Sequence, residues 1–153
     1  MADANPATTP DPDTFLNMNR TFAAPREQVY AAWTEPEHLK QWWGPEGFVS
    51  PDAEIDLRVG GRYRAGMRAP DGTEMAVVGE YTEIAAPERL AFTWAWNPPM
   101  GGPEETLVTV EFRDLGDMTE VVLTHERFLS VESRDQHQHG WTSTFVCLEQ
   151  ALG

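Results

Sequence analysis

The chain has 153 residues and a formal net charge of −14, with 11 Lys and Arg residues against 25 Asp and Glu residues. This length fits one domain, which can bury about two thirds of the surface that its unfolded chain exposes. Nucleic acids and anionic membrane surfaces are bound through Lys and Arg side chains that neutralise phosphates. The acidic composition therefore argues against both, and we expect no nucleic-acid and no membrane partner.

Cysteine content and the N-terminal sequence bear on the cellular compartment. Cys147 is the only cysteine, which excludes an intrachain disulfide. The first residues lack the basic and apolar regions of a signal peptide. No run of eighteen apolar residues, the length needed for a membrane-spanning helix, occurs in the sequence. We therefore expect a cytoplasmic protein.

The N-terminal part begins with a segment that has nothing large to bury. Residues 1–13 are rich in Pro, Asp, Thr and Ala, which predicts a disordered tail before a single domain over residues 14–153. A first strand is expected to end near Phe22. Pro25 then suits the first position of a helix, and Thr34–Glu37 has the pattern of a capping box that starts a second short helix.

The middle of the chain alternates between apolar and charged residues. The first alternating run extends from Ala53 to Val59 and the second from Arg62 to Arg68. Period-two alternation predicts antiparallel strands with one buried and one solvated face. Asp71-Gly72 is a hairpin-turn signal. Further strands are predicted near residues 75–84, 90–96, 105–113 and 119–128.

The first two of these strands predict a defined hairpin register. If Ile55 shares a face with Tyr63, the loop between the strands must hold an odd number of residues. The simplest loop is 59–61, with a glycine in the left-handed region. This register pairs Asp56 with Arg64 on the solvated face.

The last segment predicts a long helix. Ser133 and Gln136 form a capping-box pattern at its start. An apolar stripe then recurs at steps of four, four, three and four residues, at His137, Trp141, Phe145, Leu148 and Leu152. The expected fold is therefore α+β, with a curved antiparallel sheet of about seven strands wrapped on a long C-terminal helix and two short helices after the first strand.

Residues of the types that bind metals or act as nucleophiles do not occur in a suitable pattern. His137 and His139 would point about 200° apart on a helix, so they cannot chelate one ion together. No zinc-site or nucleophile-elbow motif is present. His125 and Glu126 face opposite sides of a strand and do not form a dyad. We therefore predict no metal, no cofactor and no catalytic residue.

Several segments are similar, in order along the chain, to one protein family. They are Trp33-Thr34, Gln41–Pro45, Val59–Arg64, Gly79–Ile84, Pro87–Leu90, Leu123–Phe128 and His139–Trp141. Over residues from about 15 to 152 the chain resembles the bacterial single-domain branch of the activator of heat-shock protein 90 ATPase homologue family, which belongs to the START-related, birch-pollen-allergen-like superfamily. The resemblance implies a helix-grip fold with a cavity between the curved sheet and the C-terminal helix, open to apolar ligands.

The superfamily hosts several functions on one scaffold, so the resemblance leaves three hypotheses. The first is a non-enzymatic binding module for a small hydrophobic or aromatic molecule, as a monomer or homodimer. The second is a co-chaperone or stress-response interaction domain. The chain has no room for the N-terminal domain that carries most of the chaperone contact in the eukaryotic protein, so we expect direct chaperone activation to be absent or weak. The third is a cyclase-type enzyme, for which His125 is the candidate proton carrier.

The expected ligand-binding residues are those that the alternation points inward, together with His125. They are Tyr63, Met67, Met75, Phe92, Trp94, Trp96, His125, Trp141 and Phe145. Each aromatic residue and methionine in this set is also suited to an ordinary core. The sequence therefore leaves open whether the six tryptophans fill the space under the helix or surround a cavity.

Overall fold

The computed structural model describes residues 15–97 and 105–152. The tail predicted for residues 1–13 lies outside the described residues. The elements are, in chain order, β1 (Leu16–Phe22), α1 (Arg26–Thr34), α2 (Pro36–Leu39), β2 (Ala53–Ile55), β3 (Arg62–Arg68), β4 (Glu74–Ala85), β5 (Arg89–Asn97), β6 (Glu105–Asp114), β7 (Thr119–Glu126) and α3 (Val131–Leu152).

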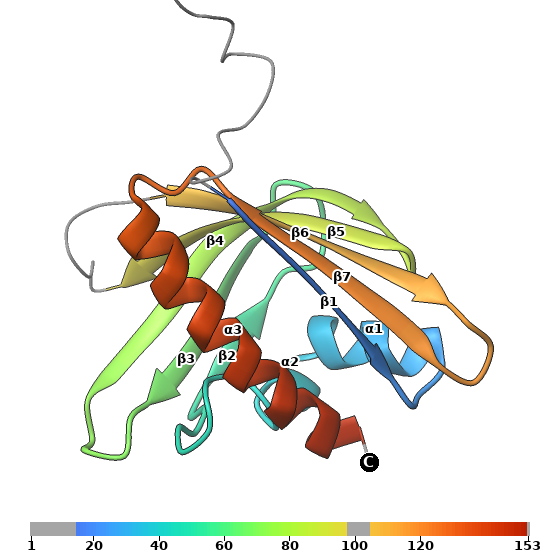
Figure 1. The fold of residues 1–153 in the computed structure, drawn as a ribbon, viewed down its shortest axis with the longest axis horizontal. Coiled ribbons are helices and arrows are strands. Elements are labelled where there is room, and N and C mark those ends of the chain that lie inside the picture. The colour runs from blue at the N-terminus through green and yellow to red at the C-terminus, as the bar shows by residue number, and fades with distance from the viewer. Residues whose placement is uncertain (1–14, 98–104, 153) are drawn as a thin grey trace, which may run out of the picture.

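The seven strands form one antiparallel sheet in the order β1-β7-β6-β5-β4-β3-β2. Helices α1 and α2 connect its two edge strands, and α3 crosses the concave face (Figure 1). A register shift in the β4–β5 pair, between Tyr81 and Glu83, marks a β-bulge, which adds local bend to a sheet. The predicted α+β helix-grip fold is confirmed.

Strands β6 and β7 show why one face of the sheet is buried. Every second residue of each strand points to the concave side. The buried residues are Thr106, Val108, Val110 and Phe112 on β6 and Thr119, Val121, Leu123 and His125 on β7. His125 therefore enters the core because it shares the phase of Leu123, two residues before it.

The register of the β2–β3 hairpin is partly as predicted. Ile55 lies opposite Tyr63, so the two residues share a face as expected. Glu54, however, lies opposite Arg64, and the predicted pairing of Asp56 with Arg64 is wrong. Burying one face of the hairpin requires an odd number of loop residues, but a loop of three residues and a loop of five residues both meet this requirement.

The loop of this hairpin spans residues 57–61 instead of 59–61. Gly60 has φ +86°, the left-handed conformation that a glycine adopts without strain. Leu57 and Val59 are 41% and 62% exposed. Their alternation with charged residues predicted a strand that continues to Val59. This prediction is wrong, because β2 ends at Ile55.

The helix boundaries differ from the predicted caps. Pro25 precedes α1 as its N-cap residue. The hydroxyl of Thr34 donates back to the carbonyl oxygen of Tyr30, at 2.9 Å, so Thr34 does not cap α2; Glu35 occupies that position without a side-chain cap.

The N-terminus of α3 also lies earlier than the sequence pattern suggested. The hydroxyl oxygen of Ser130 accepts a hydrogen bond from the backbone N–H of Ser133 at 3.0 Å, which is the geometry of an N-cap. Ser130 thus caps the helix, and the predicted cap at Ser133 is wrong. The apolar stripe is confirmed at Trp141, Phe145 and Leu148, which are buried.

Gly79 provides a test of how closely the sheet is packed. A Cβ atom at this position would meet the carbonyl oxygen of Thr93, and it would lie 2.8 Å from the ring of Tyr63. The Tyr63 hydroxyl also donates to that carbonyl oxygen, at 2.6 Å, so neither neighbour can move freely. We expect Gly79→Ala to lower the free energy of unfolding by about 2 to 3 kcal/mol, measured by urea denaturation. A loss below about 0.5 kcal/mol, the range of neutral surface changes, would contradict this packing.

Candidate functional site

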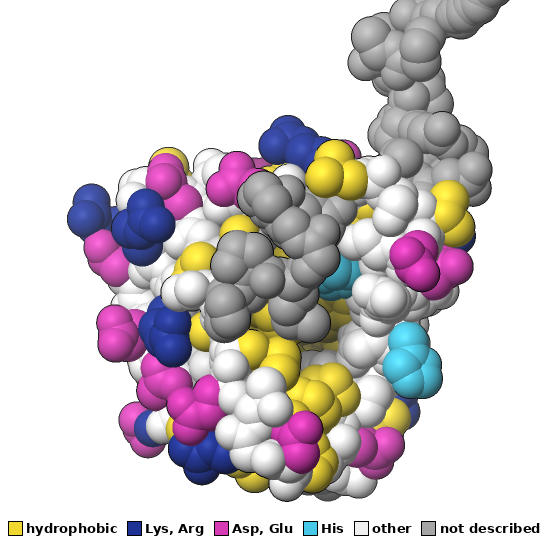
Figure 2. Space-filling model, turned by 90° about the vertical axis from the view of Figure 1, so that its left-hand side faces the viewer, with side chains coloured by type: hydrophobic (Ala, Val, Ile, Leu, Met, Phe, Trp, Pro, Cys, Tyr) yellow, Lys and Arg dark blue, Asp and Glu magenta, His cyan; other side chains and the backbone are white. Residues whose placement is uncertain are grey.

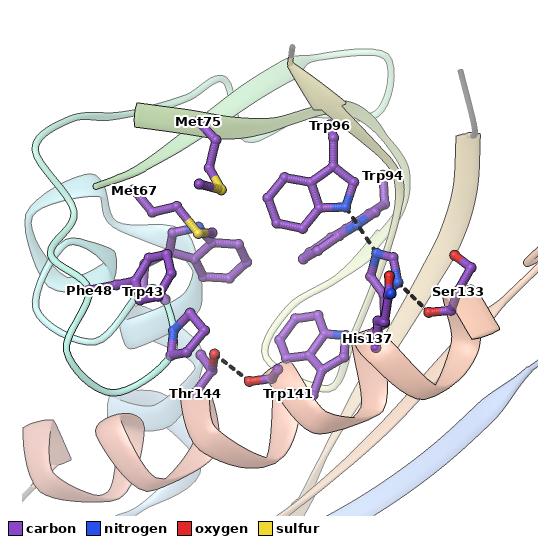
Figure 3. Close-up of a pocket in the computed structure, with 14 residues that line it drawn as sticks. Trp43, Phe48, Met67, Met75, Trp94, Trp96, Ser133, His137, Trp141 and Thr144 are labelled. Atoms are coloured by element: carbon purple, nitrogen blue, oxygen red, sulfur yellow. Dashed lines mark hydrogen bonds between the residues drawn. The ribbon is translucent and has the colours of Figure 1, made fainter. Parts of the chain in front are cut away.

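A cavity of about 230 Å³ lies between helix α3 and the strands β3, β4 and β5 (Figure 3). Its lining residues are Trp43, Gly44, Pro45, Phe48, Met67, Met75, Trp94, Trp96, Ser133, Gln136, His137, Gly140, Trp141 and Thr144. The family resemblance implied a cavity between the sheet and the C-terminal helix, and the structure has one at this place. The six tryptophans therefore do not fill the space beneath the helix completely.

The sheet wall of the cavity is made of thioether and indole groups. Met67 on β3 and Met75 on β4 are direct cross-strand partners, so their side chains lie on the same face. Trp94 and Trp96 on β5 also share this face, with ring centroids 5.8 Å apart. Methionine sulfur atoms and indole rings are apolar and polarizable, which makes this wall suited to contact with an aromatic ring.

The helix wall carries neutral polar groups at helical spacing. Residues three and four positions apart on α3 share one side of the helix, and the cavity-lining residues of α3 follow this spacing. The hydroxyl of Thr144 donates to the carbonyl oxygen of Gly140 at 2.8 Å. Among the described residues, none of those that line the cavity is Asp, Glu, Lys or Arg. The described walls are therefore uncharged apart from the titratable His137.

A loop after α2, residues 43–48, forms the third wall. Gly44 has φ +106°, which permits the sharp turn that brings Phe48 to the cavity. The backbone N–H of Glu46 donates to the hydroxyl of Ser143 on α3, at 2.8 Å. This bond holds the loop against the helix. The residues of this wall were not among the predicted ligand-binding residues, although the tryptophan pair within the Gln41–Pro45 motif was a signal for them.

Trp141 is held by a chain of hydrogen bonds that runs through buried His125. The indole N–H of Trp141 donates to Nδ1 of His125 at 3.1 Å. Because Nδ1 accepts, the proton of the neutral imidazole lies on Nε2, which is 2.7 Å from the Thr106 hydroxyl oxygen. That hydroxyl in turn donates to the carbonyl oxygen of Trp94, at 3.4 Å. Burial, and secondarily the neighbouring His137, keep the pKa of His125 well below its usual value.

A second tryptophan–histidine pair lies beside the first. The indole N–H of Trp96 donates to Nε2 of His137 at 3.0 Å, and Nδ1 of His137 donates to the carbonyl oxygen of Ser133 at 2.8 Å. The imidazole rings of His125 and His137 are 5.1 Å apart, centroid to centroid. Two of the indoles that line the cavity thus donate hydrogen bonds to imidazoles, Trp141 to His125 and Trp96 to His137. Figure 3 shows the second of these pairs.

The structure places the nine predicted ligand-binding residues in two groups. Five line the cavity: Met67, Met75, Trp94, Trp96 and Trp141. The other four, Tyr63, Phe92, His125 and Phe145, are buried in the core and do not line it. The inward face of the sheet extends beyond the cavity, so some residues on this face pack in the core instead. Tyr63 and Phe92 are examples, since they pack edge-to-face with ring centroids 5.3 Å apart.

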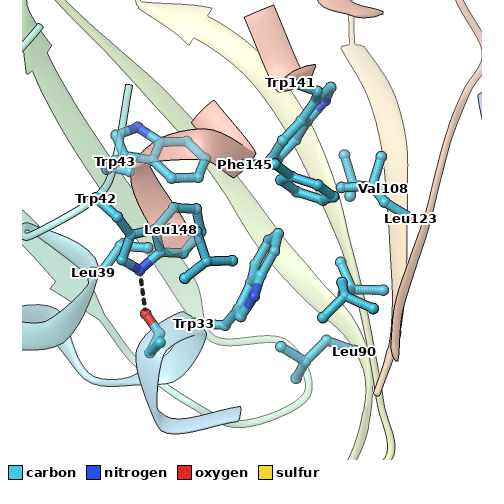
Figure 4. Close-up of a cluster of buried hydrophobic side chains, with 14 of the residues drawn as sticks. Trp33, Leu39, Trp42, Trp43, Leu90, Val108, Leu123, Trp141, Phe145 and Leu148 are labelled. Atoms are coloured by element: carbon cyan, nitrogen blue, oxygen red, sulfur yellow. Dashed lines mark hydrogen bonds between the residues drawn. The ribbon is translucent and has the colours of Figure 1, made fainter. Parts of the chain in front are cut away.

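Phe145, Trp33 and Trp42 belong to the hydrophobic core beside the cavity. Phe145 packs edge-to-face on Phe22 and Trp33, at 5.8 and 6.3 Å between centroids. The indole N–H of Trp42 donates to the carbonyl oxygen of Ala32 at 2.9 Å. These contacts fill the other end of the space under α3 (Figure 4), so that the cavity is confined to the part near β3–β5.

His125, the candidate proton carrier, is not among the residues that line the cavity. Both nitrogens of His125 are engaged, and its side chain is fully buried behind the cavity wall. Within residues 15–97 and 105–152, no three His, Cys, Asp or Glu side chains are grouped so as to hold a metal ion. In the same part of the chain, no helix has the length and apolar character needed to cross a membrane.

Fold and cavity together define a helix-grip protein with a largely apolar pocket beneath its C-terminal helix. The family described as "Activator of Hsp90 ATPase homolog 1-like protein" matches residues 23–153, and the chain belongs to this family. Comparison with functionally curated proteins gives no match.

Solved structures of bacterial proteins are similar over nearly their whole length. A protein from Chromobacterium violaceum is 28% identical, with a TM-score of 0.82, and the alignment covers 91% of this chain and 96% of that one. The AHSA1 protein from Silicibacter pomeroyi is 29% identical, with a TM-score of 0.80 and coverage of 90% and 96%. A protein from Nitrosomonas europaea is 27% identical, with a TM-score of 0.78 and coverage of 93% and 96%.

The buried neutral state of His125 has a consequence for stability. The unfolded chain binds a proton on this imidazole at a pKa of about 6.5, whereas the folded protein binds it only at lower pH. The free energy of unfolding should therefore fall as the pH drops below about 6.5, by up to about 1.4 kcal/mol per pH unit. Urea unfolding between pH 7.5 and 5 should show this slope in the parent protein and a shallower one in His125→Gln. Parallel profiles for the two proteins would contradict it.

Proposed function

We propose that this protein is a non-enzymatic binding module whose cavity takes one small, uncharged aromatic molecule. The observation that carries the proposal is the cavity beneath α3, with walls of indole rings, thioethers and neutral polar groups. A charged ligand enclosed without a counter-charge would lose its hydration without compensation. The described residues provide no lysine, arginine or carboxylate in the wall for that purpose.

The volume of the cavity indicates how large a molecule it can hold. A dry apolar cavity of about 150 Å³ in another protein accommodates benzene. A cavity of about 230 Å³ therefore suits a molecule of roughly ten to twelve non-hydrogen atoms, such as two fused rings with one substituent.

Hydrophobic side chains gather toward the middle of the face that Figure 2 shows, with charged side chains around them.

The walls are pre-formed, which favours binding. Trp96 and Trp141 are fixed by hydrogen bonds to His137 and His125. Trp94 packs between neighbouring rings, with its centroid 5.1 Å from that of Trp141. Side chains that are already ordered lose little conformational entropy when a ligand enters.

Binding of a neutral two-ring probe tests the proposal. We expect 2-naphthol to bind with one-to-one stoichiometry and a dissociation constant on the order of tens of micromolar, measured by isothermal titration calorimetry at pH 7. The carboxylate 2-naphthoate, which has the same two rings but a negative charge, should bind at least tenfold more weakly because the described walls provide no Lys or Arg side chain. Equal or tighter binding of 2-naphthoate would contradict an uncharged ligand, and no binding of 2-naphthol would contradict the proposed function.

Filling the cavity should remove this binding. In Met67→Trp the larger side chain would occupy the space beside Met75, at a cost in stability of about 1 to 3 kcal/mol from overpacking. The matched control is Met118→Trp, since Met118 is 44% exposed and does not line the cavity. Calorimetry should show no 2-naphthol binding to the folded Met67→Trp protein and unchanged binding to the control. Parent-like affinity in Met67→Trp would place the ligand elsewhere.

A further inference from the structure

Gly140 lies in the interior of α3, where a glycine is not expected on structural grounds. Glycine is one of the poorest helix formers because it loses the most backbone freedom on folding. A glycine inside a helix often reflects crowding, but a Cβ atom at Gly140 would have no neighbour within 4 Å. By contrast, Gly79 is explained by crowding, since a Cβ there would meet the Thr93 carbonyl oxygen. Helix packing thus gives no reason for the missing side chain at position 140.

The vacant position faces the cavity. Gln136 and Thr144, one turn before and one turn after Gly140, both line the cavity, as Gly140 itself does. Residues at this spacing share one side of a helix, so a side chain at position 140 would project between these two. The carbonyl oxygen of Gly140 also accepts the Thr144 hydroxyl. The bare backbone is therefore a flat, neutral and hydrogen-bonded strip of the wall.

We propose that Gly140 determines the size of the ligand, because its missing side chain leaves room on the helix wall for the second ring of a two-ring aromatic molecule. This inference rests on the proposed function and adds the position that separates one-ring from two-ring ligands. The opposite wall carries Met67 and Met75, whose flexible side chains adjust to a ring that lies against the helix. The glycine lowers the stability of α3 at this position, and it leaves space in the cavity.

Substitutions that add side-chain volume at this position separate the effect of Gly140 on helix stability from its effect on ligand size. Gly140→Ala should raise the melting temperature of the unliganded protein by about 1 to 3 °C, because alanine is the better helix former. It should weaken 2-naphthol binding at least threefold, whereas phenol, with one ring, should keep its affinity within about twofold. Gly140→Leu should weaken 2-naphthol binding at least thirtyfold. Calorimetry gives the 2-naphthol affinities, and ligand-detected NMR gives those of the weaker phenol.

The matched control is Gln138→Leu, which introduces the same side chain at an exposed position of the same helix. It should bind both probes as the parent does. If the parent and both Gly140 variants bind 2-naphthol equally, the role of Gly140 is wrong and the proposed function stands. If the parent itself fails to bind 2-naphthol, the proposed function and the role of Gly140 are both wrong. A melting temperature of Gly140→Ala more than about 5 °C below the parent would also overturn the inference, because it would show that the space is not open.

Discussion

The indole of Trp141 is the contact on which the position of helix α3 depends. It is 3% exposed, and its N–H reaches across to His125 on β7. Its ring packs on Trp43 and Trp94, with centroids 5.9 and 5.1 Å away. One side chain thus joins the helix to the sheet and to the loop after α2. Because the same side chain lines the cavity, the contact that fixes the helix also fixes the width of the site.

Histidine in this site acts as a hydrogen-bond acceptor within an apolar wall. His125 and His137 each accept a hydrogen bond from an indole N–H, and each donates a hydrogen bond from its other ring nitrogen to a protein oxygen. Because both nitrogens of His125 are engaged and its side chain is buried, this imidazole has no free position from which to exchange a proton with a ligand. These hydrogen bonds therefore hold the indole rings of Trp96 and Trp141 in place and support the shape of the cavity.

Periodicity in the sequence identifies which face of an element is buried, but it does not identify which end of that face lines a cavity. For this reason Met67 and Tyr63, two positions of the same phase four residues apart on β3, were predicted together, although only Met67 lines the cavity. Phe48 could not be predicted, since its place depends on a loop held by a tertiary hydrogen bond. The role that we propose for Gly140 depends on the empty space beside the helix, which no local pattern encodes.

The location of a bound two-ring molecule is tested most directly by NMR on protein with ¹³C-labelled methionine methyl groups. With saturating 2-naphthol, intermolecular nuclear Overhauser effects are expected to the methyl groups of Met67 and Met75, which line the cavity. None is expected to Met18 or Met118, which do not. Contacts to Met18 or Met118 without contacts to the cavity pair would show that aromatic molecules bind elsewhere on the protein and would contradict a ligand site beneath α3.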